Sequence, residues 1–279
     1  MKKTNAVVKV KWKKPSLFAM ICLLLPLVVM VEAVEMVLVP AGAFMMGHDN
    51  GDPDEVPAHE VYLDAYYISK TEITNQQYYT FWLADGDEQG QHTPLGFGLD
   101  RLDWPSCAIH YADYPAVGVS WEDASAYAKW TGCRLPTEAE WEKAARGDTG
   151  NLWPWGNQIN LKKKQPLANV WDGQDGYDNQ LAPVGYFAEG SSVYGVLDMA
   201  GNVWEWVADW YDASYYHRSP KDDPQGAIAG CWKSLRGGSW IDNMQATISI
   251  NRYYAYPTVA TSFIGFRLAK DANPPSNQN

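Results

Sequence analysis

The segment from Asp198 to Trp206 reads DMAGNVWEW. Asp198 and Glu205 bracket a Gly-Asn turn, and Glu205 stands between two tryptophans. A carboxylate among aromatic rings needs a cation or several hydrogen-bond donors, because an unpaired buried charge is costly. The segment therefore predicts a polar turn inside an aromatic part of the fold.

The sequence around this segment is rich in turns. Beyond Gly147 there is no long helical periodicity, and Gly, Asn, Asp and Trp dominate. Alternating or apolar runs bounded by turn residues predict short strands. The predicted strands cover 37–39, 44–47, 61–68, 234–236 and 263–268.

Three helices are predicted in the first half of the chain, each from its capping residue. They cover Asn75–Trp82, Trp121–Trp130 and Glu138–Arg146. Thr74 stands three residues before Gln77, and Thr137 three residues before Glu140, so each pair can exchange side-chain and backbone hydrogen bonds. Ser120 opens the remaining helix. Helices and strands together predict one α+β domain over 34–270, followed by a polar tail over 271–279.

The first 33 residues have the layout of a secretory signal peptide. A lysine-rich leader precedes the apolar run Ser16–Val31, and Val31 and Ala33 place small residues at a cleavage site. The alternative is an uncleaved anchor, but the run is shorter than the ~20 residues of a spanning helix and Pro26 interrupts it. We expect cleavage, a mature chain without membrane segments, and a periplasmic or secreted location.

The charge of the chain is divided between leader and body. Of 22 basic and 33 acidic residues, six lysines and Glu32 lie in residues 1–33, which leaves 16 basic and 32 acidic residues and a net charge of −16. Phosphate binding needs a basic footprint, so no nucleic-acid partner is expected. Cys107, Cys133 and Cys231 remain after cleavage and allow at most one disulfide, whose pairing stays open.

Eight segments together resemble the formylglycine-generating enzyme (sulfatase-modifying factor) domain family. In family order they are MVLVPAG (36–42, continuing to Met46-Gly47), ISKTEITN (68–75), VSWEDA (119–124), RLPTEAEWE (134–142), WPWGN (153–157), MAGNVWEW (199–206), RGGSW (236–240) and GFR (265–267). The resemblance implies a C-type-lectin-like fold that is loop-rich and has little regular secondary structure, which agrees with the dense turns.

The resemblance also implies two structural calcium sites. The first maps onto Asn169, Val170, Asp175 and Tyr177, and the second onto Asp198, Gly201, Val203 and Glu205. Calcium prefers six to eight oxygen ligands from carboxylates, amides and backbone carbonyls, which these residues can offer. The alternative is that they are turn residues capping their own backbone.

The copper chemistry of the oxidase members is not expected here. Those members hold copper with two cysteines, and the matching positions are Asp242 and Thr247. Soft Cu(I) selects thiolates, and the oxygen donors of Asp and Thr do not replace them. The resemblance to pyoverdine-maturation proteins, another enzymatic branch, stays open because export fits it.

A recognition surface is predicted between the Gly-Gly-Ser-Trp and Gly-Phe-Arg motifs. Its candidate ligand-binding residues are Ser239, Trp240, Asp242, Asn243, Asn251, Arg252, Tyr253 and Tyr254. Tyr and Asn combine rigid contact area with adaptable hydrogen bonding. The alternative for Tyr253 and Tyr254 is packing in the core.

The sequence therefore favours a ligand-binding or accessory protein for a peptide, glycan or small molecule. No catalytic residues can be assigned, because no Ser-His-Asp or Cys-His arrangement is legible from the spacing. The alternative is an enzyme that modifies an exported protein or a secondary metabolite.

Overall fold

The computed structural model describes residues 33–85, 92–95, 103–159, 166–171, 175–177 and 179–272. The predicted signal peptide thus lies outside the described residues except for Ala33, and so does most of the predicted tail. The fold described here belongs to the unit Val31–Asn279. Among the described residues, no helix combines the length and apolar character needed to cross a bilayer.

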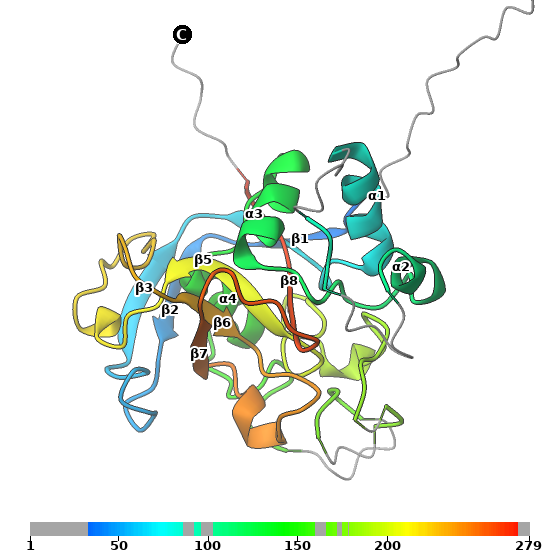
Figure 1. The fold of residues 1–279 in the computed structure, drawn as a ribbon. Coiled ribbons are helices and arrows are strands. Elements are labelled where there is room, and N and C mark those ends of the chain that lie inside the picture. Colours follow the sequence, from blue (N-terminus) through cyan, green and yellow to red (C-terminus); the bar gives the residue numbers. More distant parts are fainter. Residues whose placement is uncertain are drawn as a thin grey trace, which may run out of the picture. The chain divides into compact units, whose positions relative to one another are not determined.

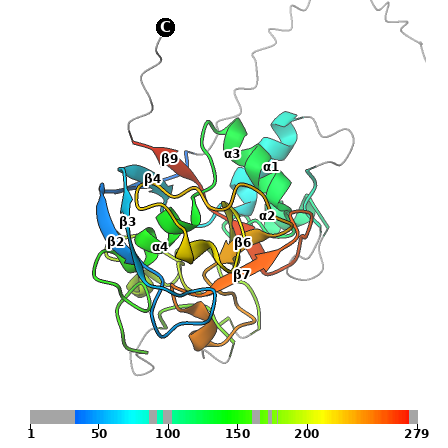
Figure 2. The ribbon, with the colours of Figure 1, turned by 90° about the vertical axis from the view of Figure 1, so that its left-hand side faces the viewer.

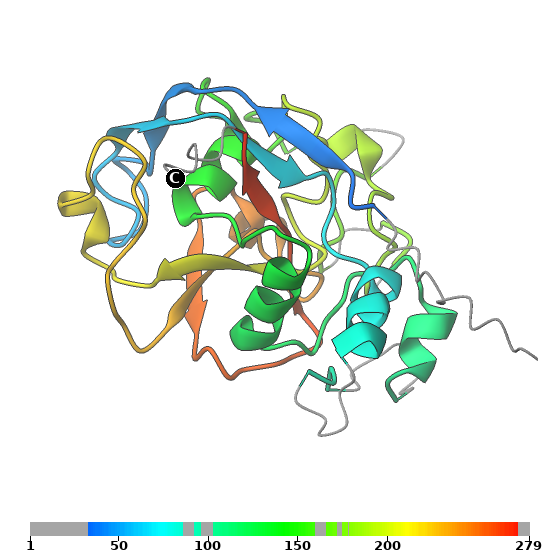
Figure 3. The ribbon, with the colours of Figure 1, turned by 90° about the horizontal axis from the view of Figure 1, so that it is seen from above.

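The described strands form three small sheets (Figure 1). The first has the order β1-β4-β9, from Met36–Val39, Tyr66–Ser69 and Ala269–Asp271, and the second pairs β2 (Gly42–Met46) with β3 (His59–Leu63). The third has the order β7-β6-β5-β8, from Arg252–Ala255, Lys233–Arg236, Trp204–Trp210 and Ile264–Phe266. Figure 3 lets the reader follow the red C-terminal strand β9 alongside β4, its antiparallel partner.

The predicted helices are confirmed. Those at α3 (Trp121–Trp130) and α4 (Glu138–Arg146) have the predicted bounds, and α1 (Asn75–Asp85) runs further than predicted. Both reciprocal capping bonds form at each helix start. The five-residue helix α2 (Ser106–His110) was not predicted, and its N-cap Pro105 makes no side-chain capping bond. Short 3₁₀ turns cover Ala188–Gly190, Tyr215–His217 and Met244–Thr247.

The strand expected over 61–68 is in fact two strands. Val61 and Leu63 of β3 pair with β2, whereas Tyr66 and Ile68 of β4 pair with β1. The alternation of buried side chains shifts by one residue at the break, from Val61 and Leu63 to Tyr66 and Ile68, and tyrosines on both faces hide this shift in the sequence. The expected tail also begins too early, because Asp271 pairs with Tyr66 in β9.

The long strand β5 was missed because its first four residues are all buried and show no alternation. The cysteines Cys107, Cys133 and Cys231 are all free, so none of the possible pairings is made in the described structure.

Helix α4 is buried on every side. It contacts β2, β5 and β6, and Figure 2 shows it between the β2–β3 ribbon and the sheet that carries β6 and β7. All nine of its residues are buried, including three glutamates, Lys143 and Arg146. Buried charges need partners, so this helix organises a polar interior around which the candidate site is built.

Candidate functional site

The two positions matching the family's copper cysteines hold oxygen side chains that are already engaged. Asp242 Oδ2 accepts hydrogen bonds from Ser239 N (3.0 Å), Ser239 Oγ (2.6 Å) and Trp204 Nε1 (2.9 Å). Thr247 is buried, and its hydroxyl donates to the carbonyl of Met244 at 2.9 Å. These residues do not fit a copper centre, because Cu(I) selects thiolates.

The loop that carries these positions is tightly packed. Gly238 has a φ of +73°, and a Cβ placed there would lie 2.7 Å from Thr247 Cγ2. Asn243 caps the 3₁₀ turn by accepting from the backbone N–H groups of Gln245 and Ala246. The loop before β7 is therefore held in one conformation by its own packing and hydrogen bonds.

Next to this loop, an aromatic ladder is formed by the buried Trp204 of β5, by Tyr253 and Tyr254 of β7, and by Tyr211, Trp232 and Tyr256, which flank β5, β6 and β7. Ring centroids lie 5.2 Å apart for Trp204–Tyr253, 5.8 Å for Tyr253–Tyr254 and 4.2 Å for Tyr254–Tyr211, and Trp232 adds contacts to Tyr254 and Tyr256. Tyr253, Tyr254 and Tyr256 are 49%, 41% and 55% exposed. Core packing is thus excluded for Tyr253 and Tyr254.

The remaining predicted surface residues range from exposed through half-buried, for Trp240, Asp242 and Asn251, to buried. Asn243 is exposed, while Ser239 and Arg252 are buried. Arg252 forms an ion pair with Glu138, with Nε 2.8 Å from Oε1 and Nη2 3.0 Å from Oε2. Trp240 Nε1 donates to the carbonyl of Ser262, and Asn251 Nδ2 to that of Ala246. Of the predicted surface residues, Asn243, Tyr253 and Tyr254 are the exposed ones.

At the first implied calcium site, Asp175 and Asn169 behave differently. The Asp175 carboxylate accepts from the backbone N–H groups of Val170 (3.0 Å) and Tyr177 (2.8 Å), which matches the turn-capping alternative. Asn169 donates from Nδ2 to Gln180 O and Asn202 Oδ1, but its buried Oδ1 has no donor in the described structure. A buried acceptor without a donor is rare and suggests a missing partner such as an ion or water.

At the second implied site, Glu205 has the several donors that its burial demands. Its carboxylate accepts from Trp141 Nε1 (2.7 Å), Arg267 Nε (2.6 Å) and Arg267 Nη2 (2.7 Å). Asp198 is different, because Oδ2 accepts from Gly185 N while buried Oδ1 has no donor among the described residues. Gly201 of the intervening turn has a φ of +77°, and a Cβ there would lie 2.2 Å from the carbonyl oxygen of Asn169.

A residue that the sequence reasoning missed stands beside this site. Glu72 is fully buried, Oε1 accepts from Asn202 Nδ2 at 3.0 Å, and Oε2 has no donor in the described structure. Burial raises the pKa of Glu72 well above its usual value, and the carboxyls of Asp198 and Glu205 raise it further. The signal was available, since Glu72 lies within the ISKTEITN segment used for the family resemblance.

Three buried oxygens without a donor among the residues that the structure describes, Glu72 Oε2, Asn169 Oδ1 and Asp198 Oδ1, are called the donor-poor region below. Within the described part of the chain, no group of three or more His, Cys, Asp or Glu side chains is arranged to hold a metal ion. Calcium bound here would therefore depend on backbone carbonyls and a side-chain amide in addition to carboxylates, as calcium sites commonly do.

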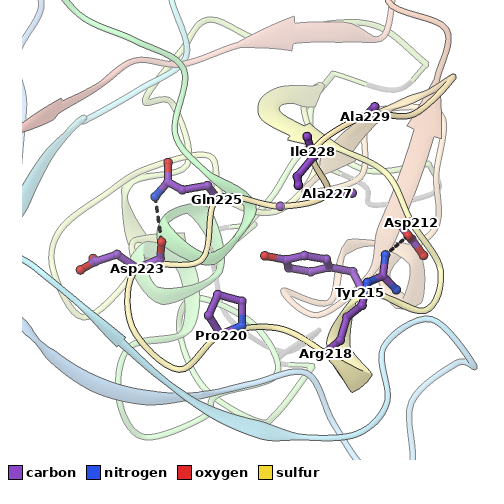
Figure 4. Close-up of a pocket in the computed structure, with 10 residues that line it drawn as sticks. Asp212, Tyr215, Arg218, Pro220, Asp223, Gln225, Ala227, Ile228 and Ala229 are labelled. Carbon is purple, nitrogen blue, oxygen red and sulfur yellow. Dashed lines mark hydrogen bonds and ion pairs between the residues drawn. The ribbon is translucent and has the colours of Figure 1, made fainter.

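A separate open pocket of about 530 Å³ lies in the loop after β5 (Figure 4). Tyr215 and Pro220 form part of its wall, and the ion pair between Arg218 and Asp212 stands at one side. Ile228, at the rim, is fully exposed. No sequence motif indicated this pocket, and its Arg218 and Asp212 side chains pair with each other.

Comparisons with known proteins bear on this geometry. The sequence profile described as "Sulfatase-modifying factor enzyme 1-like domain" matches residues 28–272. The formylglycine-generating enzyme of Streptomyces coelicolor is 32% identical over 287 residues, which cover 85% of this chain and 89% of that protein. Serine/threonine-protein kinase Pkn1 of Chlamydia trachomatis is 36% identical over 246 residues, covering 85% of this chain but only 38% of the kinase.

Among solved structures, PvdO from Pseudomonas aeruginosa superposes with a TM-score of 0.70 and 31% identity, covering 85% of this chain and 94% of PvdO. Treponema denticola variable protein 1 has a TM-score of 0.68 at 24% identity, covering 85% and 94% of the two chains, and shares the fold. The loop-rich α+β fold, the profile match and the relatives agree, and the chain belongs to the family of sulfatase-modifying factor enzyme 1-like domains.

Proposed function

We propose that this chain is an exported, calcium-stabilised member of the family that binds a ligand on its aromatic ladder and does not act as a copper-dependent oxidase. One observation carries the proposal. Asp242 and Thr247 stand at the cysteine positions, in hydrogen bonds of the loop, while the adjacent Tyr253 and Tyr254 are half exposed.

The ladder has the chemistry of a recognition surface. Tyrosine and tryptophan offer large, rigid contact area at low cost in side-chain entropy, and their polar ends form hydrogen bonds. Stacking between Tyr211 and Tyr254 fixes the rings before a ligand arrives, which reduces the ordering cost of binding. A peptide, a glycan or a small molecule suits such a surface.

The binding test uses a glycan array and a displayed peptide library, both probed with the labelled protein. Ligands that bind the wild type are expected to lose most of their signal with Tyr253→Ala/Tyr254→Ala. Tyr62→Ala is the matched control, because Tyr62 on β3 is exposed to a similar degree, 38%. An unchanged binding pattern in the double variant would rule out the ladder as the ligand site.

The oxidase test incubates the protein with copper and a peptide bearing a sulfatase-type cysteine motif. No aldehyde product is expected, because neither Asp242 nor Thr247 supplies a thiolate for Cu(I). Robust turnover would refute the non-oxidase part of the proposal.

Calcium is proposed because of the acceptors without donors at Asn169 and Asp198. Val170 and Tyr177 would add backbone carbonyls at the first position, as Gly201 and Val203 would at the second, with Asp175 and Glu205 as the remaining family-implied ligands. Bound calcium would tie these loops together and supply the missing positive charge.

Thermal melts test the calcium proposal. A cation bound only by the folded state stabilises it by mass action, about 2.7 kcal/mol at a hundredfold excess over Kd. The melting temperature is expected to fall by several degrees after chelation. Equal melts, with initial loading and complete removal verified by metal analysis, would refute both sites.

Export is proposed from the lysine-rich leader and the apolar run before Ala33. Mass spectrometry of the exported protein should find a mature N-terminus near Val34. Retention of the leader in a membrane fraction would favour the anchor alternative.

A second candidate is an enzyme that modifies an exported protein or metabolite. The similarity to the formylglycine-generating enzyme of Streptomyces coelicolor, at 32% identity, supports it. Mass changes in candidate substrates incubated with the protein would distinguish this function from simple binding.

A further inference from the structure

We propose that a groove around Gln225 is a second binding site, and that it takes an organic cation with several N–H donors, such as a polyamine or a lysine side chain. The described residues that line this groove do not belong to the aromatic ladder. The site is therefore separate from the ligand surface described above and does not depend on it.

The groove is formed by three adjoining pockets. The pocket of about 530 Å³ after β5 shares Asp223 and Gln225 with a pocket of about 690 Å³, and a third, of about 250 Å³, shares Gln225 with both. Arg134 lines the second and the third. Figure 4 shows the hydrogen bond from Gln225 Nε2 to the carbonyl oxygen of Asp223, at 2.9 Å, in the wall of the first pocket. Pockets joined in this way can hold an elongated ligand.

The wall that carries Gln225 is fixed on both sides. The loop between β5 and β6 is tied to β3, because Tyr62 N donates to Lys221 O at 2.7 Å and Asp223 N donates to Tyr62 O at 2.9 Å. Further along the same loop, Ala227 forms a β-bridge with Trp210 of β5. A wall that is formed before the ligand arrives reduces the ordering cost of binding.

The largest of the three pockets, called the acidic cavity below, has an excess of negative charge. Among the residues described, its lining holds one guanidinium and four carboxylates, a formal net charge of −3, from Arg134, Asp64, Glu140, Asp223 and Asp271. Lys143 lies within electrostatic range of Asp223, but it is buried and does not line the cavity. A cleft lined mainly by one sign of charge concentrates ligands of the opposite sign, so the cavity favours a cation.

The hydrogen-bonding groups of the acidic cavity select the same kind of ligand. The five N–H groups of Arg134 are taken up by Asp271, Glu140 and the carbonyl of Leu135. Several acceptor atoms receive no hydrogen bond within the described part of the chain: Asp271 Oδ2, Asp223 Oδ2, Gln225 Oε1 and both carboxylate oxygens of Asp64. A lining that offers mainly acceptors suits a ligand that brings donors, and an ammonium group brings three donors and no acceptor.

An organic cation matches this lining better than a metal ion. A metal ion needs oxygens that converge on one point at about 2.0–2.6 Å, and the described acidic side chains form no such group of three. An alkyl chain with ammonium groups can instead meet one carboxylate at a time. Its methylene groups would lie against the apolar walls of the neighbouring pockets, which include Trp121 and Leu135 on one side and Tyr215 and Pro220 on the other.

The test is isothermal calorimetry of the purified protein at low ionic strength with three probes. They are 1,6-diaminohexane, a tetralysine peptide with blocked ends, and hexamethonium, which has the charge and spacing of diaminohexane but no N–H groups. We expect one molecule of diaminohexane or of tetralysine to bind, and hexamethonium to bind at least about tenfold more weakly, because it brings no donors. Binding of diaminohexane alone would identify the ligand as a free amine, and binding of tetralysine alone would identify it as a lysine-containing protein segment. Binding of neither amine, or equal binding of diaminohexane and hexamethonium, would overturn the proposal.

The double variant Asp64→Asn/Asp223→Asn locates the site. Asparagine keeps the size of each side chain, and it tolerates the φ of +43° at position 223. We expect it to weaken amine binding roughly tenfold or more, because hydrogen bonds to charged groups are lost.

Asp113→Asn/Glu189→Gln is the matched control, since it removes the same charge from exposed positions outside the three pockets. Its affinity should stay within about twofold of the wild type, because distant surface charges are screened. Equal weakening in the two double variants would show that net charge alone attracts the amines, and would overturn the proposal. If Asp64→Asn/Asp223→Asn does not fold, Gln225→Lys replaces it. This change places an ammonium group where the three pockets meet and should also weaken binding, so an unchanged affinity would overturn the proposal.

Discussion

Two buried polar regions of this molecule handle charge in opposite ways. In the first, named here the arginine-paired region, Glu138 and Glu142 of α4 meet the guanidinium groups of Arg146, Arg236 and Arg252. All four oxygens of the two glutamates accept hydrogen bonds. In the donor-poor region, Glu72 and Asp198 have no arginine partner at hydrogen-bonding distance among the described residues.

The difference teaches that burial alone does not mark a binding site. Glu142 and Glu72 are both fully buried, yet the first is satisfied by the protein and the second is not. The arginine-paired region serves as scaffold, since it ties α4 to β6 and β7. On the calcium proposal, a cation would contribute only in the donor-poor region, so changes to the two regions should respond differently to calcium.

The largest effect is expected from Arg236→Met in saturating calcium. The substitution removes donors to Glu138, Glu142 and the carbonyl of Ser249, so that Glu142 Oε2 keeps only the 3.5 Å hydrogen bond from Tyr216. Breaking a buried pair by removing one partner costs about 3–5 kcal/mol. Urea unfolding measures the loss, which calcium should not restore. A loss below about 1 kcal/mol would mean that the region is not the scaffold argued here.

The scaffold was in part predictable from the sequence. The bounds of α3 and α4 followed from local capping chemistry, because Ser120 and Thr137 bind N–H groups only three residues away. The break between β3 and β4 was not predictable, since it depends on pairing with distant strands. Regular structure set by near neighbours can be inferred, and structure set by remote partners cannot.

The same distinction between near and remote partners decides what could be predicted of the site. The segment DMAGNVWEW indicated that Glu205 needs a cation or several donors, and the structure supplies donors from Trp141 and Arg267. Those partners are remote in sequence, so the choice between the two could not be made beforehand. Glu72 lies in the ISKTEITN segment, but its role could not be inferred from that segment, because a missing donor is a property of the folded surroundings.

A second, pH-dependent effect is expected at Asp209, which borders the arginine-paired region. Its Oδ2 accepts from Glu138 N at 2.8 Å. Burial, and next the Glu138 charge, raise the pKa of Asp209 to about 7. Because the folded state holds this proton more tightly than the unfolded state, the group's contribution to stability falls as pH rises from about 4 to 7.

Asp209→Asn tests that expectation, because asparagine can still accept from Glu138 N but does not titrate. In saturating calcium, used so that any calcium site proposed above stays loaded, the variant should gain stability relative to the wild type as pH rises through this window. The gain is at most ~1.4 kcal/mol for each pH unit. A stability difference that stays flat from pH 4 to 8 would show that Asp209 ionises normally.

The smallest effect is expected from Arg218→Met, a matched arginine deletion at the surface. Arg218 and Asp212 form an ion pair whose side chains are 52% and 29% exposed, and the hydrogen bond from Arg218 lowers the pKa of Asp212 to about 2. Water and salt screen such a pair, so its loss should cost less than about 1 kcal/mol at pH 7, and still less in high salt or as pH falls toward 2. The same urea assay compares it directly with Arg236→Met. Burial of the ion pairs is what makes the arginine-paired region the scaffold. Equal losses of stability in the two variants would contradict this.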